Sequence, residues 1–447
     1  MVKRVVFSFL LISLTLACQT GPKSQKNMDY AVNEANFEEA LLALERGQEE
    51  GGSSAYAASN AISLHLDRGM LGHYAKNYAS SSNDLQNAEL LIEDAYTKSV
   101  TERFFSYIIN DNTKQYPGED FEDIYLNVFN ALNYYHRGDM EGALVEIRKL
   151  SISSGKLDML ARKYEYVDPD SGASIGDIVK KETGVEELPP TLSVNFSNSA
   201  LARYLGALFY LGGGNTDSAR IEFDQIERAF NTNRSIYSHP VPDAVEEARN
   251  VPRGKARLNI ISFAGLSPVK TQKVEIFPLP FHHPILRVGF FKVPVLTGRA
   301  SNITRIEVVV DGKDKFNMEL LEDMGKVVEE TYKARYSNIV LKTYIRTILK
   351  YAVADISASV TNNKNPAVGF AVALAARTAM DLSEKADIRM SRYIPDKAYI
   401  GGVNLDPGIY SVIINYYNEK TLVDSEEYNN VIVRQNGLNL LESVNLK

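Results

Sequence analysis

The spacing of apolar residues divides the chain near residue 250. From residue 29 to about 249, apolar side chains recur every three or four positions, as in Ile124, Val128 and Leu132, which is typical of helices with one buried face. Beyond Pro252 the period changes to two and predicts strands, at 256–263, 273–277, 286–290, 303–310, 409–416, 431–433 and 438–444. We therefore predict an α+β protein with a helical domain over 29–250 and a strand-rich domain over 251–447.

A local pattern repeats along the helical half. A turn is followed by an apolar, aromatic or polar residue at a helix start, a small residue three positions on, and an apolar residue four further on. The helix starts are Phe37, Tyr78, Met140 and Thr216, and the small residues are Ala40, Ser81, Ala143 and Ala219. This resembles the second half of a tetratricopeptide repeat, where the small residue lets two antiparallel helices approach closely. The small residues lie 41, 62 and 76 positions apart, so we expect an irregular array with insertions, with a series of unrelated αα-hairpins as the alternative.

The strand-rich half predicts an antiparallel β-sandwich with an inserted helical hairpin. A Pro-Gly turn at Pro407-Gly408 precedes the alternating run 409–416, as is common in small sandwiches. Between about residues 318 and 385 the apolar spacing becomes helical again. The core of its second helix, 367–376, is small and apolar, but ten residues cannot span a bilayer.

Residues 1–17 predict a signal peptide, and Cys18 predicts a site of lipidation. A short basic region precedes the apolar stretch 5–16, which is shorter than the about 20 residues that a membrane-spanning helix needs. The arrangement resembles bacterial lipoprotein precursors, in which the cysteine thiol is joined to diacylglycerol and becomes the first residue. Thr15 departs from the aliphatic residue that is usual there. An ordinary signal peptide followed by a chance cysteine is the alternative.

The residues after Cys18 predict a flexible tether and the membrane to which the chain is sorted. Residues 18–28 are mostly polar and predict a flexible linker between the lipid and the folded part. Gln19 rather than Asp follows the cysteine, which resembles lipoproteins that are sorted to the outer membrane. We therefore expect an acylated chain (palmitate being a typical acyl group) on the outer membrane, facing the periplasm.

Composition narrows the classes of partner. The 447 residues carry a formal net charge of −7 and a single cysteine. The negative charge disfavours a nucleic-acid binder, which needs a basic face to displace counterions from phosphates. We expect the membrane as one partner, through the lipid anchor, and another envelope protein or peptide as the second.

Five stretches carry the most distinctive sequence: 116–122, 131–135, 138–148, 202–206 and 384–389. Together they resemble a family of uncharacterised bacterial lipoproteins with tetratricopeptide-like N-terminal halves. The resemblance covers nearly the whole mature chain, and it implies the anchor and the helical repeats but no chemistry. Family members place a Trp shortly after the last stretch, where this chain has Met390-Ser391-Arg392-Tyr393.

Polar residues in these stretches are the candidates for a partner-binding site. They are Glu119, Asp120, Asn133, Tyr134, Glu146, Arg148, Arg203 and Tyr204. The turn at Gly118 brings two carboxylates to a helix start, where the helix dipole favours negative charge, so replacing either by its amide should cost about 0.5–1 kcal/mol. A paired acid site is the alternative for these carboxylates. For Glu146 and Arg148 the alternative is a solvated or intramolecular ion pair.

The sequence contains no familiar catalytic or metal-binding signature. Neither a Gly-x-Ser-x-Gly elbow nor a His-Glu-x-x-His motif nor a phosphate-binding loop is present. Ser153 to Lys156 fit Ser-x-x-Lys but lack the companion motifs. His282 and His283 are adjacent in an extended segment and point to opposite sides, which disfavours joint metal ligation. We predict no metal and no cofactor.

The sequence as a whole predicts a lipid-anchored envelope scaffold that binds a protein or peptide in a groove along its helical repeats. Two alternatives stay open. One is an enzyme or activator acting on the cell wall, with Glu119, Asp120 or Glu146 as acids. The other is a structural component of an envelope assembly. A cleft joining the acids to His283 would favour the enzyme, and a broad groove would favour binding.

Overall fold

The structure, a computed structural model, describes residues 23–49, 58–101, 115–151, 198–278, 288–333 and 385–447, together with Tyr56, Phe196 and a few positions between 335 and 343. Cys18, the first part of the predicted tether, His282, His283 and most of the predicted helical insertion lie outside these residues.

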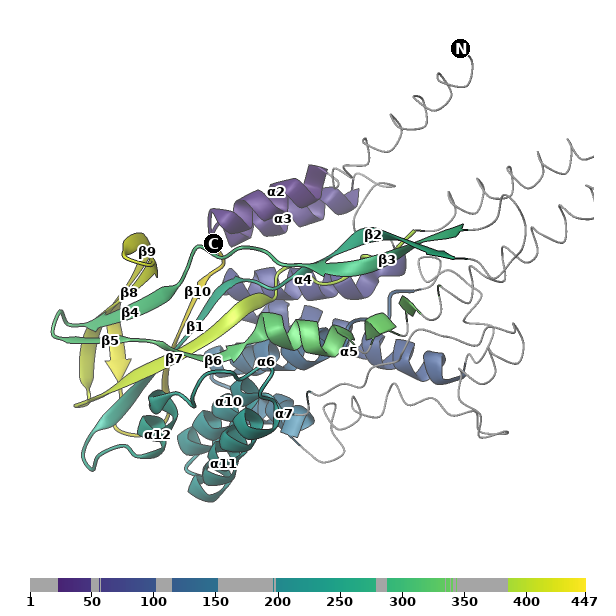
Figure 1. Ribbon diagram of the computed structural model, residues 1–447. Helices are drawn as coiled ribbons and strands as arrows, with labels where there is room; N and C mark the ends of the chain where they lie inside the picture. Colours follow the sequence, from purple (N-terminus) through teal and green to yellow (C-terminus); the bar gives the residue numbers. More distant parts are fainter. Residues whose placement is uncertain are drawn as a thin grey trace, which may run out of the picture.

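Helices of the first half pair into hairpins (Figure 1). In the described residues these are α2 (Lys23–Asn33) with α3 (Phe37–Glu49), α4 (Ala61–Tyr74) with α5 (Tyr78–Thr101), α6 (Asp120–His136) with α7 (Met140–Ser151), and α10 (Ala200–Gly212) with α11 (Thr216–Thr232). The short turn η1 (Ala58–Asn60) precedes α4, and α12 (Asp243–Arg249) follows α11. Because α2 begins at Lys23, the predicted tether over 18–28 is wrong from that residue on. None of the helices in the described residues is long and apolar enough to cross a membrane.

The hairpins turn through one shared backbone geometry. The third residue before each second helix begins the turn, and the next residue has positive φ: Ala35 (54°), Lys76 (62°), Gly138 (78°) and Gly214 (77°). The residue after it donates its amide to the carbonyl five positions earlier over 2.8–2.9 Å, in Asn36, Asn77, Asp139 and Asn215. This is a Schellman helix end in which the last residue also starts the next helix. The four small residues of the sequence pattern are all buried, at 0–1% exposure: Ala40, Ser81, Ala143 and Ala219.

In the described residues of the second half, the strands form two four-stranded sheets and a ribbon (Figure 1). The first sheet has the order β10-β1-β7-β6, made of β10 (Asn439–Asn445), β1 (Ala256–Leu266), β7 (Pro395–Leu405) and β6 (Glu319–Asp323). The second has the order β5-β4-β8-β9, made of β5 (Asp314–Asn317), β4 (Arg305–Val310), β8 (Gly408–Asn418) and β9 (Thr421–Val433). The ribbon pairs β2 (Val269–Pro278) with β3 (Val288–Thr297). The prediction of purely antiparallel strands is wrong at one place, because β10 joins β1 in parallel.

Strand β1 is buried on both faces because it lies between the helices and the second sheet. Leu258 and Ile260 belong to an apolar cluster shared with β4 and β8 of the second sheet. Ile261 and Phe263 point the other way into a cluster shared with the helices, where the rings of Phe263 and Phe129 of α6 are 4.9 Å apart. The alternation that predicts a strand therefore separates two apolar neighbours rather than core from solvent. Helices, first sheet and second sheet form three layers.

One hydrophobic core spans the predicted domain boundary at residue 250. The boundary coincides with a change of secondary structure, since α12 ends at Arg249 and β1 begins at Ala256. The cluster that fills the helical half also contains Ile400 of β7 and Leu440 of β10. We therefore expect the two predicted domains to unfold together.

The predicted helical insertion over 318–385 begins later than the sequence indicates. Residues 319–323 form β6, and residues 324–333 are helical. The hydrophobic spacing misleads here because Leu321 and Met324 are both buried, the first on a strand and the second on the helix that follows it. Strands β5, β6 and β7 are absent from the sequence prediction.

Candidate functional site

Buried polar groups lie between the first helices of the hairpins and the strands that pack on them. We call this set of side chains the seam: Asp67, His73, Glu119, Glu122, Lys270, Glu322 and Glu442. The first six residues are 0–5% exposed, and the side chain of Glu442 is 6% exposed. Burying a charge is costly unless it is paired and hydrogen-bonded, so the partners of these groups decide what the seam can do.

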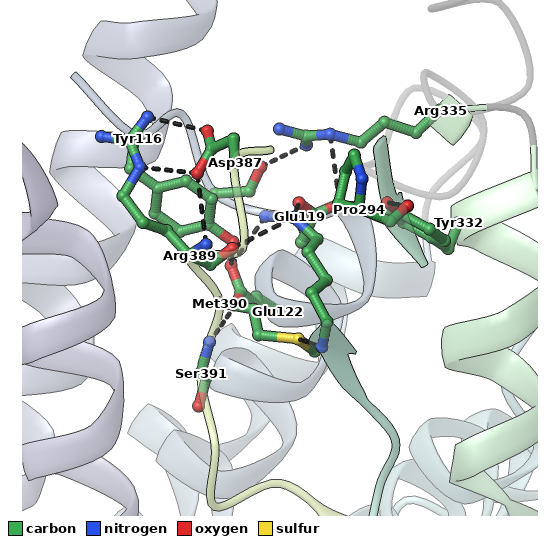
Figure 2. Close-up of polar contacts among 12 residues, drawn as sticks. Tyr116, Glu119, Glu122, Pro294, Tyr332, Arg335, Asp387, Arg389, Met390 and Ser391 are labelled. Carbon is green, nitrogen blue, oxygen red and sulfur yellow. Dashed lines mark hydrogen bonds and ion pairs between the residues drawn. The ribbon is translucent and has the colours of Figure 1, made fainter. Parts of the chain in front are cut away.

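The most charged part of the seam lies at the start of α6 (Figure 2). Glu119 is the N-cap residue of α6, and its carboxylate forms an ion pair with Lys270 of β2, with side chains 1% and 2% exposed. Arg335 lies 3.1 Å from the same carboxylate and also donates to the carbonyl of Gly118. Aromatic rings enclose the ammonium of Lys270, with the centroids of Tyr116 and Tyr332 at 5.6 and 5.4 Å. The helix start that the sequence predicts for Glu119 is confirmed, but its carboxylate also serves a buried ion pair.

Glu122 lies one turn further along α6 and accepts three hydrogen bonds. The donors are the hydroxyl of Tyr116 at 2.8 Å, the amide of Glu119 at 2.7 Å and the amide of Ser391. Burial, followed by the negative charge of Glu119, raises the pKa of Glu122 to about 7. The folded state thus holds this proton more tightly than the unfolded chain. Glu122 therefore makes the fold less stable as pH rises from about 4.5 to 7.

Two of the distinctive sequence stretches meet here. Arg389 forms hydrogen bonds of 2.8 and 2.7 Å with the carboxylate of Asp387, and its guanidinium lies 5.4 Å from the ring centroid of Tyr116. The stretch 116–122 and the described part of the stretch 384–389 thus come together around Glu119 and Glu122, as Figure 2 shows.

A second part of the seam joins two histidines to one carboxylate. Glu442 of β10 accepts from Nε2 of His73 on α4 at 2.7 Å and from Nε2 of His136 on α6 at 2.6 Å. Burial alone would raise the pKa of Glu442, but the positive charge of His73 and the bonds from both rings hold it well below the usual range. The C-terminal strand is therefore tied to two helices by a carboxylate.

The protonation of His73 follows from the hydrogen bonds on its other side. The hydroxyl of Ser81 donates to the carbonyl of Gly69 at 2.6 Å, so its oxygen accepts from Nδ2 of Asn133 at 2.8 Å. This leaves Oδ1 of Asn133 facing Nδ1 of His73 at 2.8 Å, so Nδ1 carries a proton. Nε2 faces the ionised Glu442 and carries the second proton. Burial opposes this charge, yet the pKa of His73 is raised by Glu442 and Asn133.

A third part of the seam is a carboxyl group that hydroxyl and amide donors surround. Glu322 of β6 accepts from the hydroxyls of Tyr125 at 2.8 Å and Tyr237 at 2.6 Å. It also accepts from the hydroxyl of Ser199 and the amide of Leu201, at the N-terminus of α10. Burial raises the pKa of Glu322. The carboxyl closes the start of α10 and fixes it to the first sheet.

The eight candidate residues from the sequence do not form one site. Glu119, Asp120 and Asn133 lie on or beside α6, and the first and last belong to the seam networks above. Glu146 is buried on α7 and accepts from Asn127 at 2.8 Å and Lys149 at 3.0 Å.

The remaining four candidates each form a hydrogen bond with a side chain of another helix or strand. Tyr134 accepts from Gln86 at 2.7 Å, Arg148 donates to Tyr210 at 3.1 Å, Arg203 donates to Glu222 at 3.0 Å, and Tyr204 donates to Asn259 at 3.5 Å. Glu146 thus forms an intramolecular ion pair with Lys149, and Arg148 contacts the hydroxyl of Tyr210. A shared partner-binding role for the eight residues stays a prediction.

Of the seam residues, sequence reasoning found only Glu119 and missed the other six: Asp67, His73, Glu122, Lys270, Glu322 and Glu442. Lys270 and its partner Glu119 are separated by 151 residues, and His136 and Glu442 by 306. No local pattern links residues so far apart. The available signal was a charged residue inside an otherwise alternating strand, as at Glu442 in 438–444.

Neither metal chemistry nor a known relative accounts for the seam. In the part of the chain that the structure describes, no group of three or more His, Cys, Asp or Glu side chains could hold a metal ion. No protein-family model, curated protein or solved structure matches the chain.

Proposed function

We propose that the chain is a lipid-anchored protein of the outer membrane, facing the periplasm, that binds another envelope protein or peptide through tetratricopeptide-like repeats. Its strand-rich half would be a β-sandwich that closes one face of the repeats. The shared turn geometry of the four hairpins and the apolar cluster between the two sheets support this reading of the fold. The proposed location on the outer membrane is based on the sequence around Cys18.

The proposed binding surface is the outer face of the second helices. The sequence predicts an open groove along the repeats, whereas α4, α6 and α10 contact the first sheet through the seam. Three of the four second helices instead carry an exposed apolar residue two positions after the buried small residue, whereas α5 has the polar Asn83 there. The apolar residues are Leu42 (45% exposed), Val145 (45%) and Ile221 (50%), and Leu90 (64%) lies two turns further along α5. This regularity is the observation that carries the proposal, since scattered exposed apolar residues would show no common register.

The enzyme alternative has less support. Two of the three carboxylates that would act as acids, Glu119 and Glu146, are 2% and 3% exposed and are held in ion pairs with lysines. The third, Asp120, is 6% exposed. A role as a structural component of an assembly would use the same outer face, so the crosslinking below bears on both.

Lipidation at Cys18 is the first expected result. Cells fed a clickable fatty acid should incorporate label into the wild-type chain and not into Cys18→Ser, because Cys18 supplies the only thiol in the chain. In-gel fluorescence measures the label. Label retained in the Cys18→Ser chain would contradict the proposed anchor.

Site-specific photocrosslinking tests the binding surface. A photoreactive residue at Val145 or Ile221 should give the same discrete crosslinked species in cells. The matched control is Ile409 of β8, which is also apolar and 65% exposed but lies on the second sheet. Absence of adducts at both helical positions, or equal yield of the same adduct at Ile409, would contradict the proposal.

A further inference from the structure

The chain segment between the predicted insertion and β7 runs across the helices without regular structure. Residues 385–394 are neither helix nor strand, and residues 389–394 pass between the first helices and the β2 region. We call residues 389–394 the cis segment. Its backbone groups are bound by side chains on both sides, and the two sides differ in charge.

On the helical side, two acids take the backbone amides. The amide of Ser391 donates to the carboxylate of Glu122, and the amide of Arg392 donates to Asp67 at 2.7 Å. The hydroxyl of Ser391 donates to the same oxygen of Asp67 at 2.8 Å. Both acids are completely buried. Two consecutive amides thus donate hydrogen bonds to carboxyl groups from two neighbouring helices, α6 and α4.

On the strand side, two bases take the backbone carbonyls. Lys270 donates to the carbonyl of Arg389 at 3.0 Å, and Arg299 donates to the carbonyl of Arg392 at 2.6 Å. Further donors to the carbonyls of the segment are the hydroxyl of Tyr74 to Tyr393 and the amide of Ser267 to Ile394, at 2.7 and 2.9 Å. Carboxyl groups thus accept from the backbone amides, and basic side chains donate to the backbone carbonyls. Hydrogen bonds with charged partners are stronger than those between neutral groups.

Side chains of the segment add a second level of recognition. The guanidinium of Arg392 forms an ion pair with Asp29 of α2 at 2.8 Å, and the hydroxyl of Tyr393 donates to the same carboxylate at 3.0 Å. Arg389 is held by Asp387 within the segment's own neighbourhood. The helices therefore bind three consecutive side chains of the segment, those of Ser391, Arg392 and Tyr393.

We propose that Asp67, Glu122, Lys270 and Arg299 form a slot that binds an extended peptide, and that the cis segment occupies this slot as an internal ligand. The ligand class is an extended segment with a Ser-Arg-Tyr core, bound through its backbone and through buried side chains such as those of Tyr393 and Ile394. The slot needs no outside partner to exist. Only its use in cells, where an extended segment of a partner would compete with the cis segment, rests on the proposed binding function.

Competition by peptide tests the slot in the purified full chain. The probe is a fluorescent peptide with the sequence of residues 387–396. In the wild type the cis segment is present at an effective concentration in the millimolar range or above, so the peptide should bind weakly. Ser391→Pro removes the amide hydrogen bond to Glu122 and the hydroxyl hydrogen bond to Asp67. It changes none of the four residues that form the slot. The peptide should bind this variant at least tenfold more tightly than the wild type, measured by fluorescence anisotropy.

A matched peptide and a milder variant complete the test. The same peptide with its own serine replaced by proline should bind Ser391→Pro at least tenfold more weakly than the parent peptide. If Ser391→Pro fails to fold, Ser391→Ala keeps the amide and should show a smaller gain of a few-fold. Equal binding to wild type and a folded variant, or equal binding of the two peptides, would overturn the proposal. Failure of both variants to fold would overturn it as well, because the segment would then be an inseparable part of the core. None of these outcomes depends on crosslinking at the outer face.

Discussion

Replacing Lys270 by methionine should lower the free energy of unfolding by about 3–5 kcal/mol, the cost of breaking a buried ion pair by removing one partner. Methionine keeps most of the side-chain volume, so the loss reports the charge and not a cavity. Glu119 would keep Arg335 but lose the cation that lies against it between the rings of Tyr116 and Tyr332. Urea denaturation followed by circular dichroism measures the change.

The matched control for this variant is Lys273→Met on the same strand. Lys273 pairs with Glu275 at the surface, and its side chain is 58% exposed. Its replacement should leave the free energy of unfolding unchanged within error. Equal stability of the two variants would show that the Glu119–Lys270 pair does not hold the ribbon to α6. It would also return Glu119 to the minor helix-terminus role, worth about 0.5–1 kcal/mol, that the sequence predicts.

Glu442→Gln should lower the free energy of unfolding by about 3 kcal/mol near pH 6, because two charge-assisted hydrogen bonds to histidines are lost. The effect should shrink as pH rises. The pKa of His73 is raised in the folded state, so its contribution is complete below about 6.5 and disappears as pH rises through the raised value. The pKa of Glu442 is lowered, so its contribution is present above about 4.5 and disappears in stronger acid.

The pH dependence of the stability loss in Glu442→Gln distinguishes a lost charge interaction from a loss of packing, which would not depend on pH. Urea denaturation of wild type and Glu442→Gln at pH 5.5, 7 and 8.5 should give differences that decrease in that order. Glu427→Gln, which replaces an exposed glutamate on β9 of the second sheet, is the control and should show no trend. A difference for Glu442→Gln that is constant from pH 5.5 to 8.5 would contradict a charged His73.

The helical half of the fold could be predicted because its determinants are local. Each hairpin is specified by a turn of a few residues, a polar residue that starts the next helix and a small residue three or four positions later, as at Gly138, Asp139 and Ala143. All of these lie within one or two helical turns of one another. Sequence spacing is enough to detect such a unit.

Strands β6 and β7 were out of reach for physical reasons. Residues 319–323 continue without a turn signal into a helix, so their apolar residues fit a helical period as well as a strand. β7 begins with a proline and contains Gly401 and Gly402, which weaken any strand signal. A Cβ on Gly402 would lie 2.7 Å from the carbonyl oxygen of Leu258, so the glycine is needed for close approach of β1. That requirement arises only from tertiary packing.

The seam was hidden because burial reverses the ordinary meaning of a charge. The sequence predicts Glu119 and Asp120 as carboxylates at a helix start and assigns no role to Glu122 or to Lys270, which precedes the predicted strand 273–277. In the structure the segments around them converge, and each charge finds partners from elements far apart in the chain. Composition and spacing contain no information on that convergence.

Native-state hydrogen exchange in low concentrations of urea tests the central claim, that the seam joins the helices and the first sheet into one cooperative unit. We predict that the most protected amides of α4, α6 and α10 exchange with the same free energy of opening as those of β1 and β7, and that Lys270→Met lowers all of them together. Two separate free energies, one for the helices and a different one for the sheet, would contradict this claim and support two independent domains that divide at residue 250.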